Sequence, residues 1–137
     1  MTQSSNGHHS QQIGGTIMVV MMEVEPGHEE EFNHWYDDEH LVERLEIPGY
    51  VSARRFKLEE DDRNRGGVLK YLCIWEMDDS SCLDSDEYKA QQLRPSELRD
   101  RVNAYITQRA RGVYKQIYPP VGSYEDHSGF HPEREKV

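Results

Sequence analysis

The sequence has few cysteines, no long hydrophobic run and no leader-like N-terminus. Its 137 residues include two cysteines, Cys73 and Cys82, which form neither a disulfide framework nor a C-x-x-C pair. No stretch approaches the roughly 20 apolar residues that a membrane-spanning helix needs. The basic segment followed by an apolar one that is typical of signal peptides is also missing. We therefore expect a cytoplasmic protein with reduced thiols and no membrane partner.

Basic residues are scarce as well. The chain has 16 Lys and Arg residues against 26 Asp and Glu residues, which gives a formal net charge of -10. A nucleic-acid partner requires clustered positive charge, so we expect none. The glycine-rich nucleotide-binding loops, the G-x-S-x-G motif and the H-E-x-x-H zinc motif are absent too. We therefore expect no cofactor and no bound metal.

The residues that are present suffice for one folded domain. We expect polar tails at 1–15 and 119–137 on either side of a domain that spans 16–118. Apolar runs, alternation, glycine and proline predict a strand at 16–24, a helix at 28–45, strands at 50–58 and 68–77, a helical region at 78–111 broken at Pro95, and a strand at 113–118. This β-α-β-β-α-β order is typical of the α+β ferredoxin-like fold, a four-stranded antiparallel sheet with both helices on one face.

The other face of such a sheet would be open to water. The first and third strands are rich in apolar residues, among them Met18, Val20, Met22, Leu72 and Ile74. An apolar face of this extent is typical of an interface between subunits. We therefore expect a homodimer in which two sheets pack face to face.

The first helix has an unusual apolar face. On an ideal helical wheel this face contains Phe32, Trp35, Tyr36, Glu39, Glu43 and, at its edge, His40. His34 points the other way. Carboxylates on a covered face are costly unless they are paired or protonated. Glu39 and Glu43 are therefore either paired, with Arg54 or Arg55 of the next strand as their partners, or they line a cavity.

The histidine and the aromatic residues of this helix each have two interpretations. A histidine near a helix C-terminus is often structural, because the helix dipole tolerates its proton. An imidazole in a half-apolar pocket, however, titrates near neutrality and suits general base catalysis. Trp35 and Tyr36 are typical of a core, but their polar tips need partners when buried, which suits the wall of a pocket equally well.

The stretch from Phe32 to Tyr50 resembles the EthD-type members of the dimeric α+β barrel superfamily. Their first helix carries the pattern F-x-x-(Y/W)-(Y/W)-x-x-x-H, followed by a Pro-Gly turn into the second strand. In this sequence the pattern is filled by Phe32, Trp35, Tyr36, His40, Pro48 and Gly49. Val42 stands where the family often has a proline, and the segment from the histidine to the Pro-Gly turn is longer.

The resemblance implies a dimer with a small-molecule cavity between the helices and the sheet of each subunit. In several relatives a histidine and a tyrosine in this cavity carry out acid–base chemistry. We therefore predict His40 as the base, with Tyr36 and Glu39 as its catalytic neighbours. The predicted substrate-binding residues are Phe32, Trp35, Glu43, Arg54, Tyr71 and Trp75. Among them, Arg54 and Tyr71 are candidates to hold a carboxylate or an enolate.

These residues suit proton abstraction next to a carbonyl group. Our hypothesis is a cofactor-independent lyase, isomerase or cyclase that acts on a small aromatic or polyketide-like carbonyl compound. The alternative is a non-catalytic small-molecule-binding or stress-type protein of the same fold, or a cofactor-free monooxygenase.

Overall fold

The computed structural model describes residues 14–60 and 66–120, so most of the two expected tails lies outside the described residues. The strands are β2 (Thr16–Val24), β3 (Tyr50–Lys57), β4 (Tyr71–Met77) and β5 (Ile106–Lys115). Between β2 and β3 runs one long helix, which consists of α2 (Glu29–Trp35), a π-helical turn η1 (Tyr36–His40) and α3 (Leu41–Arg44). Between β4 and β5 lie a 3-10 helix η3 (Ser80–Asp84), α4 (Asp86–Leu93) and α5 (Glu97–Asn103).

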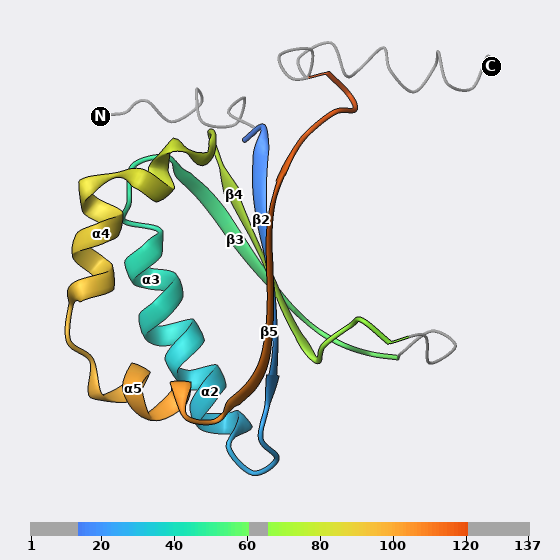
Figure 1. Cartoon of the computed structure of the whole chain (residues 1–137), viewed down its shortest axis with the longest axis vertical. Coiled ribbons are helices and arrows are strands. Elements are labelled where there is room, and N and C mark those ends of the chain that lie inside the picture. Colours follow the sequence, from blue (N-terminus) through green and yellow to red (C-terminus); the bar gives the residue numbers. More distant parts are fainter. Residues whose placement is uncertain (1–13, 61–65, 121–137) are drawn as a thin grey trace.

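The strands form one antiparallel sheet in the order β3-β4-β2-β5. The helices lie against one face of this sheet, and in the described part of the chain the opposite face carries none (Figure 1). The ferredoxin-like α+β fold predicted from the sequence is therefore confirmed. The second helical region breaks at Pro95 as expected, and Ser96 then caps α5 by accepting a hydrogen bond from the amide of Arg99.

Two boundaries predicted for the C-terminal part of the domain are wrong. Helix α5 ends at Asn103 rather than at 111, and β5 begins at Ile106 rather than at 113. β5 is an edge strand, and Arg109 and Arg111 are exposed although they pair with helix-facing residues of β2. Polar residues on both faces of a strand remove the period-two alternation by which a strand is recognised.

The core lies between the long helix and the sheet. Its largest fully buried side chains are Trp75, Tyr36, Phe32, Met77, Val102 and Cys73. Alternate residues of the central strand β4 are buried, since one of its faces is covered by the helices. Full burial of one large apolar side chain contributes about 1.5–3 kcal/mol to stability. The aromatic residues of the predicted site are therefore also core residues.

The open face of the sheet is apolar. The strand register places together on it the half-buried residues Ile17, Val19, Met21, Leu72 and Ile74. The expectation that Met18, Val20 and Met22 lie on this face is wrong, because these three side chains face the helices and pack in or against the core. The exposed rings of Phe56 and Tyr114 extend the apolar surface, since each pairs with a residue of the open face.

Candidate functional site

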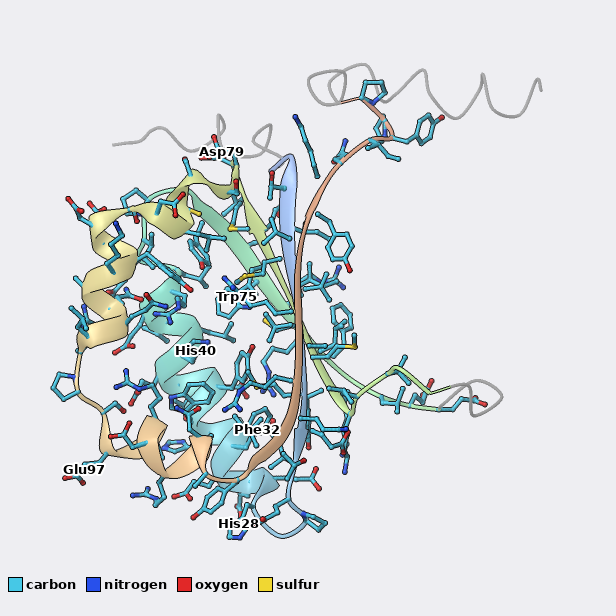
Figure 2. The ribbon with its side chains drawn as sticks, viewed as in Figure 1. His28, Phe32, His40, Trp75, Asp79 and Glu97 are labelled. Carbon is cyan, nitrogen blue, oxygen red and sulfur yellow. The ribbon has the colours of Figure 1, made fainter. Side chains whose placement is uncertain are left out.

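Three aromatic side chains surround the imidazole of His40. The imidazole stacks on the indole of Trp35, with the ring centroids 4.5 Å apart and the planes at 16°. It meets the rings of Tyr36 and Trp75 edge-on, at centroid distances of 5.0 and 5.4 Å. Trp75 projects from the sheet toward the helix that carries His40 (Figure 2). The structure thus brings together four residues that the sequence predicted for the site.

The stack of Trp35 and His40 depends on the π turn at Tyr36–His40. On a regular α-helix, residues five positions apart diverge by about 140° and do not touch. In a π turn the backbone hydrogen bonds link residues five apart, so these two side chains lie on one side of the helix. Such turns are rare and occur frequently at functional sites.

The imidazole of His40 is neutral at physiological pH. Burial is the main reason that its pKa is lowered to about 3, and the positive charges of Arg44, Arg99 and Arg55 add to the effect. Neither ring nitrogen has a hydrogen-bond or ion-pair partner among residues 14–60 and 66–120. One nitrogen therefore keeps a free lone pair, and the other a free N–H group.

The hydroxyl of Tyr36 lies on the sheet side of the long helix. Burial, together with the neighbouring thiol of Cys73, raises its pKa, so it stays protonated and does not act as a base. The crevice between Tyr36 and the sheet is too narrow to hold a water molecule; it is lined by Val20, Met22, Tyr36, Arg55, Tyr71, Leu72 and Cys73. In this conformation a ligand therefore cannot reach the Tyr36 hydroxyl through this crevice.

Arg55 of β3 lies on the side of the aromatic cluster that faces the sheet. Its guanidinium donates hydrogen bonds to Asn33 Oδ1 at 2.8 Å and to Asp37 Oδ1 at 2.7 Å. The guanidinium carbon lies 4.3 Å from the centroid of the Tyr36 ring, and the side chain is only 16% exposed. A cation over an aromatic face is attracted by the negative charge of that face. Arg55 therefore fixes the long helix and the ring of Tyr36 on the sheet.

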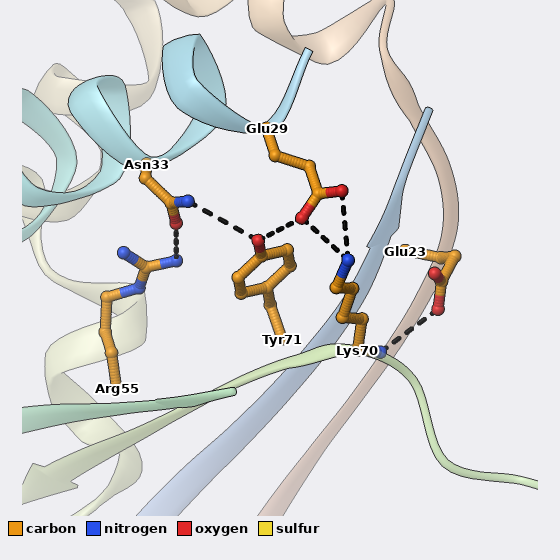
Figure 3. A network of polar contacts seen from close by, with 6 residues as sticks. All are labelled: Glu23, Glu29, Asn33, Arg55, Lys70 and Tyr71. Carbon is orange, nitrogen blue, oxygen red and sulfur yellow. Dashed lines mark hydrogen bonds and ion pairs between the residues drawn. The ribbon is translucent and has the colours of Figure 1, made fainter. Parts of the chain in front are cut away.

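Tyr71 belongs to the same polar network (Figure 3). Its hydroxyl donates to the carboxylate of Glu29 and lies 3.5 Å from the side-chain amide of Asn33. Lys70 Nζ forms an ion pair with Glu29 at 2.9 Å. The hydrogen bonds from Tyr71 and Lys70 lower the pKa of Glu29. Tyr71, predicted to bind substrate, thus has its hydroxyl engaged within the protein.

Arg54, by contrast, lies on the open face of the sheet. Its guanidinium packs over the ring of Phe56, 5.0 Å from the centroid. A β-bulge between Tyr50 and Ser52 shifts the register of β3 against β4. The bulge changes which residues face the helices, so Arg55 rather than Arg54 shares a face with Tyr50. Simple alternation from Tyr50 selects the wrong arginine.

Glu39 and Glu43 bind the second helical region. Glu39 Oε2 accepts a hydrogen bond from Ser96 Oγ at 2.6 Å, and Glu43 Oε2 pairs with Arg94 Nη1 at 3.3 Å. Their expected pairing with Arg54 or Arg55 is wrong, because this side of the long helix contacts α4 and α5 rather than β3. Within the described ranges neither carboxylate bonds to His40. Glu39 and Glu43 thus connect helices.

Two buried polar atoms have no hydrogen-bond partner in the described part of the chain, the indole nitrogen of Trp35 and the hydroxyl of Tyr50. Tyr50 meets the ring of Trp75 edge-on at 5.7 Å.

Among the described residues no three His, Cys, Asp or Glu side chains are grouped so that they could hold a metal ion. None of the described helices is long and apolar enough to cross a membrane.

Similarity to known proteins is found at the level of structure. No family model matches the sequence, and no curated protein matches it either. An EthD family protein from Bacillus halodurans matches with a TM-score of 0.52 and 14% identity over 74% of this chain and 99% of its own. An antibiotic biosynthesis monooxygenase matches with a TM-score of 0.52 and 12% identity, over 74% of this chain and 98% of its own. A dimeric ferredoxin-like protein from an uncultured marine organism matches with a TM-score of 0.53 and 11% identity, over 79% of this chain and 93% of its own.

At identities this low, the structural matches establish the fold alone. The predicted resemblance to EthD-like proteins is therefore confirmed as a likeness of fold.

Proposed function

We propose that this protein is a cofactor-independent enzyme, a lyase, isomerase or cyclase, that uses His40 for general acid–base chemistry on a small aromatic or polyketide-like carbonyl compound. The observation that carries the proposal is the neutral imidazole of His40, which packs against Trp35 and Trp75 without a hydrogen-bond partner in the described ranges. His40 is half-buried, and its ring nitrogens are not among the buried polar atoms that lack a partner, so they are open to solvent. An unpartnered imidazole keeps its bonding capacity for a ligand.

In the proposed reaction His40 takes a proton from the carbon next to a carbonyl group. The electron pair of the broken C–H bond moves to the carbonyl oxygen and forms an enolate, while the imidazole becomes an imidazolium. The guanidinium groups around His40 stabilise the enolate charge. The imidazolium then returns the proton to another atom of the same molecule, which completes an isomerisation without a cofactor.

We also propose that the protein acts as a homodimer through the open face of the sheet. This face carries a continuous group of half-buried apolar residues of β2 and β4, with Ile74 near its centre. A second copy of the same face would remove this surface from water. The match to a dimeric ferredoxin-like protein supports this arrangement.

A non-catalytic small-molecule-binding protein is the second candidate. The observation that favours it is the pKa of His40, which at about 3 makes the imidazole a weak base. General base catalysis is most efficient when the pKa lies near the operating pH. An enzyme must therefore raise this pKa when the substrate binds, whereas a binding protein need not.

The His40→Ala variant separates the two candidates. Aromatic β-keto acids and 1,3-diketones are incubated with the protein, and their decarboxylation, isomerisation or cyclisation is followed by ultraviolet absorbance. His40→Ala is expected to lower turnover by about 100-fold or more while the circular dichroism spectrum is unchanged. The matched control is His34→Ala, because His34 lies on the same helix, is exposed and pairs with Asp38 at 2.6 Å.

Unchanged turnover in His40→Ala would remove His40 from the mechanism. Binding of these compounds without turnover by the wild-type protein would favour the binding protein.

A further inference from the structure

Arg44 is a half-buried cation without a carboxylate partner in the described part of the chain. Its Nη1 donates a hydrogen bond to Gln91 Oε1 at 2.8 Å, and its guanidinium carbon lies 4.9 Å from the centroid of the Tyr88 ring. Arg55 and Arg99, the other half-buried arginines that act on His40, pair with Asp37 and Asp100. The chain has a net charge of -10, so acidic side chains are plentiful. A half-buried guanidinium that is held in one orientation without a carboxylate partner is therefore unusual.

This guanidinium lies close to the proposed base. Arg44 follows His40 by four residues in a helical segment, so the two side chains are neighbours on the same side of the helix. Of the positive charges that act on His40, that of Arg44 has the largest effect. Gln91 and Tyr88 hold the guanidinium in place from α4, which leaves part of its fork of N–H donors for another acceptor.

The hydroxyl of Tyr50 supplies a second, independent observation. Tyr50 is 8% exposed, and its hydroxyl has no hydrogen-bond partner among the described residues. The ring of Tyr50 meets Trp75, which also meets His40. Arg44 is one of the charged groups that act on this hydroxyl. A buried hydroxyl without a partner is costly, so its presence indicates that something else satisfies it.

Helix α4 covers Arg44 with Gln91 and Tyr88. The only buried residue of α4 is Gln91, and its bonds to α3 are polar: Gln91 bonds to Arg44 and to the carbonyl of Glu43, and Arg94 pairs with Glu43. Helix α5, in contrast, is anchored by the fully buried Val102. Segments with few buried apolar contacts open at the lowest free energy. Movement of α4 would uncover Arg44, at the loss of its hydrogen bond to Gln91 and of the packing of Tyr88 against the core.

We infer that Arg44 and Tyr50 bind an anionic oxygen of the ligand, and that the ligands of this site are small aromatic or polyketide-like acids. The guanidinium fork matches the two oxygens of a carboxylate, and the Tyr50 hydroxyl donates to the same group. The inference rests on the proposed function insofar as it takes the surroundings of His40 to be the ligand site. It adds the chemical class of the ligand and two residues that recognise it.

The test compares 2-naphthoate with 2-naphthamide, which has the same ring system without the charge. Isothermal titration calorimetry with the wild-type protein is expected to give at least tenfold tighter binding of the acid. In Arg44→Met the preference is expected to disappear, whereas Arg44→Lys, which keeps the charge, is expected to retain part of it. Tyr50→Phe is expected to weaken naphthoate binding severalfold without lowering the melting temperature, because the hydroxyl has no partner to lose.

Arg94→Met is the matched control. It removes the same charge from the same region, and it also removes a contact of α4 with α3, but the guanidinium of Arg94 is already neutralised by Glu43. This variant is expected to keep the preference for the acid. The melting temperature of each variant is measured to show that it is folded.

The inference is overturned if the amide binds as tightly as the acid, if neither compound binds at millimolar concentration, or if folded Arg44→Met keeps the preference. It fails separately from the proposed function. If His40→Ala loses turnover but Arg44 has no effect on the preference for the acid, the proposed enzyme function stands and the inference that the ligands are acids is refuted. If the preference for the acid depends on Arg44 but His40→Ala keeps its turnover, the proposed catalytic role of His40 is refuted and the protein is an acid-binding protein.

Discussion

The imidazole of His40 lies on the indole of Trp35 with the ring planes 16° apart, although four residues separate them in the chain. The π turn makes this contact possible, and burial in the cluster keeps the imidazole neutral. Packing, charge state and backbone conformation at this point of the long helix are therefore coupled. A change in any one of them should be measurable in the other two.

The neutral burial of His40 predicts a particular dependence of stability on pH. The folded pKa of about 3 lies below the ordinary value of 6.5, so between these values the unfolded chain binds a proton that the folded chain does not. Stability is therefore expected to fall as the pH decreases through this window, by at most about 1.4 kcal/mol per pH unit. His40→Gln removes this contribution. Urea unfolding of the wild type and of His40→Gln at pH 7, 6 and 5 measures this contribution. If their free energies of unfolding differ by the same amount at each pH, the prediction is contradicted.

Ligand binding should raise the pKa of His40. Burial is the main cause of its low value, and positive charges, that of Arg44 foremost, add to the effect. A carboxylate bound beside Arg44 offsets this charge and favours the imidazolium. A pH titration of the His40 ring resonances by NMR is expected to show a higher pKa with saturating 2-naphthoate than with 2-naphthamide. If both ligands leave the titration unchanged, the anion does not bind next to the imidazole.

Much of the fold follows from local patterns in the sequence. The apolar run of Thr16–Val24 and the alternation in Tyr71–Met77 both correspond to observed strands of the sheet. The edge strand β5 was placed too late in the chain, because Arg109 and Arg111 carry no strand periodicity. Periodicity reports burial, so it fails where a strand is not covered on either side.

The site was predicted less completely than the fold, because two local irregularities decide it. An ideal wheel places Trp35 and His40 about 140° apart, at opposite edges of the apolar face, and the π turn brings them together. Simple alternation along β3 is interrupted by the bulge after Tyr50, so that Arg55 rather than Arg54 faces the helices. Both features insert one residue into a regular element, and residue types alone do not reveal where this occurs.

Arg55 is expected to contribute more to stability than other cations of its strand. Its guanidinium bonds to Asn33 and Asp37 and packs on Tyr36. Arg55→Met is expected to cost about 1.5–3 kcal/mol, the typical contribution of hydrogen bonds to charged groups. Lys57→Met, an exposed position two residues along the same strand, should change stability by less than about 0.5 kcal/mol. Chemical denaturation of the two variants compares them, and equal losses would refute the role of Arg55.

The hydroxyl of Tyr71 is expected to control the titration of Glu29. Its hydrogen bond is the main reason that the pKa of Glu29 is lowered, so this carboxylate stabilises the fold above pH 4.5 and loses that contribution as the pH falls. Tyr71→Phe should raise the pKa of Glu29 and cost about 1 kcal/mol at pH 7. Carbon-13 NMR of the glutamate carboxyls measures the shift. Glu31 is the internal control, because its pKa is lowered mainly by Arg101 and should not change.

The open face of the sheet predicts the effect of a charge at its centre. Ile74 lies on this face beside Val19, and in a dimer built on the face it would be removed from water. Ile74→Asp is expected to convert the proposed dimer into a folded monomer, because an unpaired carboxylate in an apolar interface loses its hydration without a compensating bond. Val42→Asp is the control, since Val42 is 53% exposed on α3, in the helical layer. Sedimentation equilibrium at micromolar concentration distinguishes the two. A wild-type protein that is itself monomeric under these conditions would show that the apolar face serves another purpose than self-association.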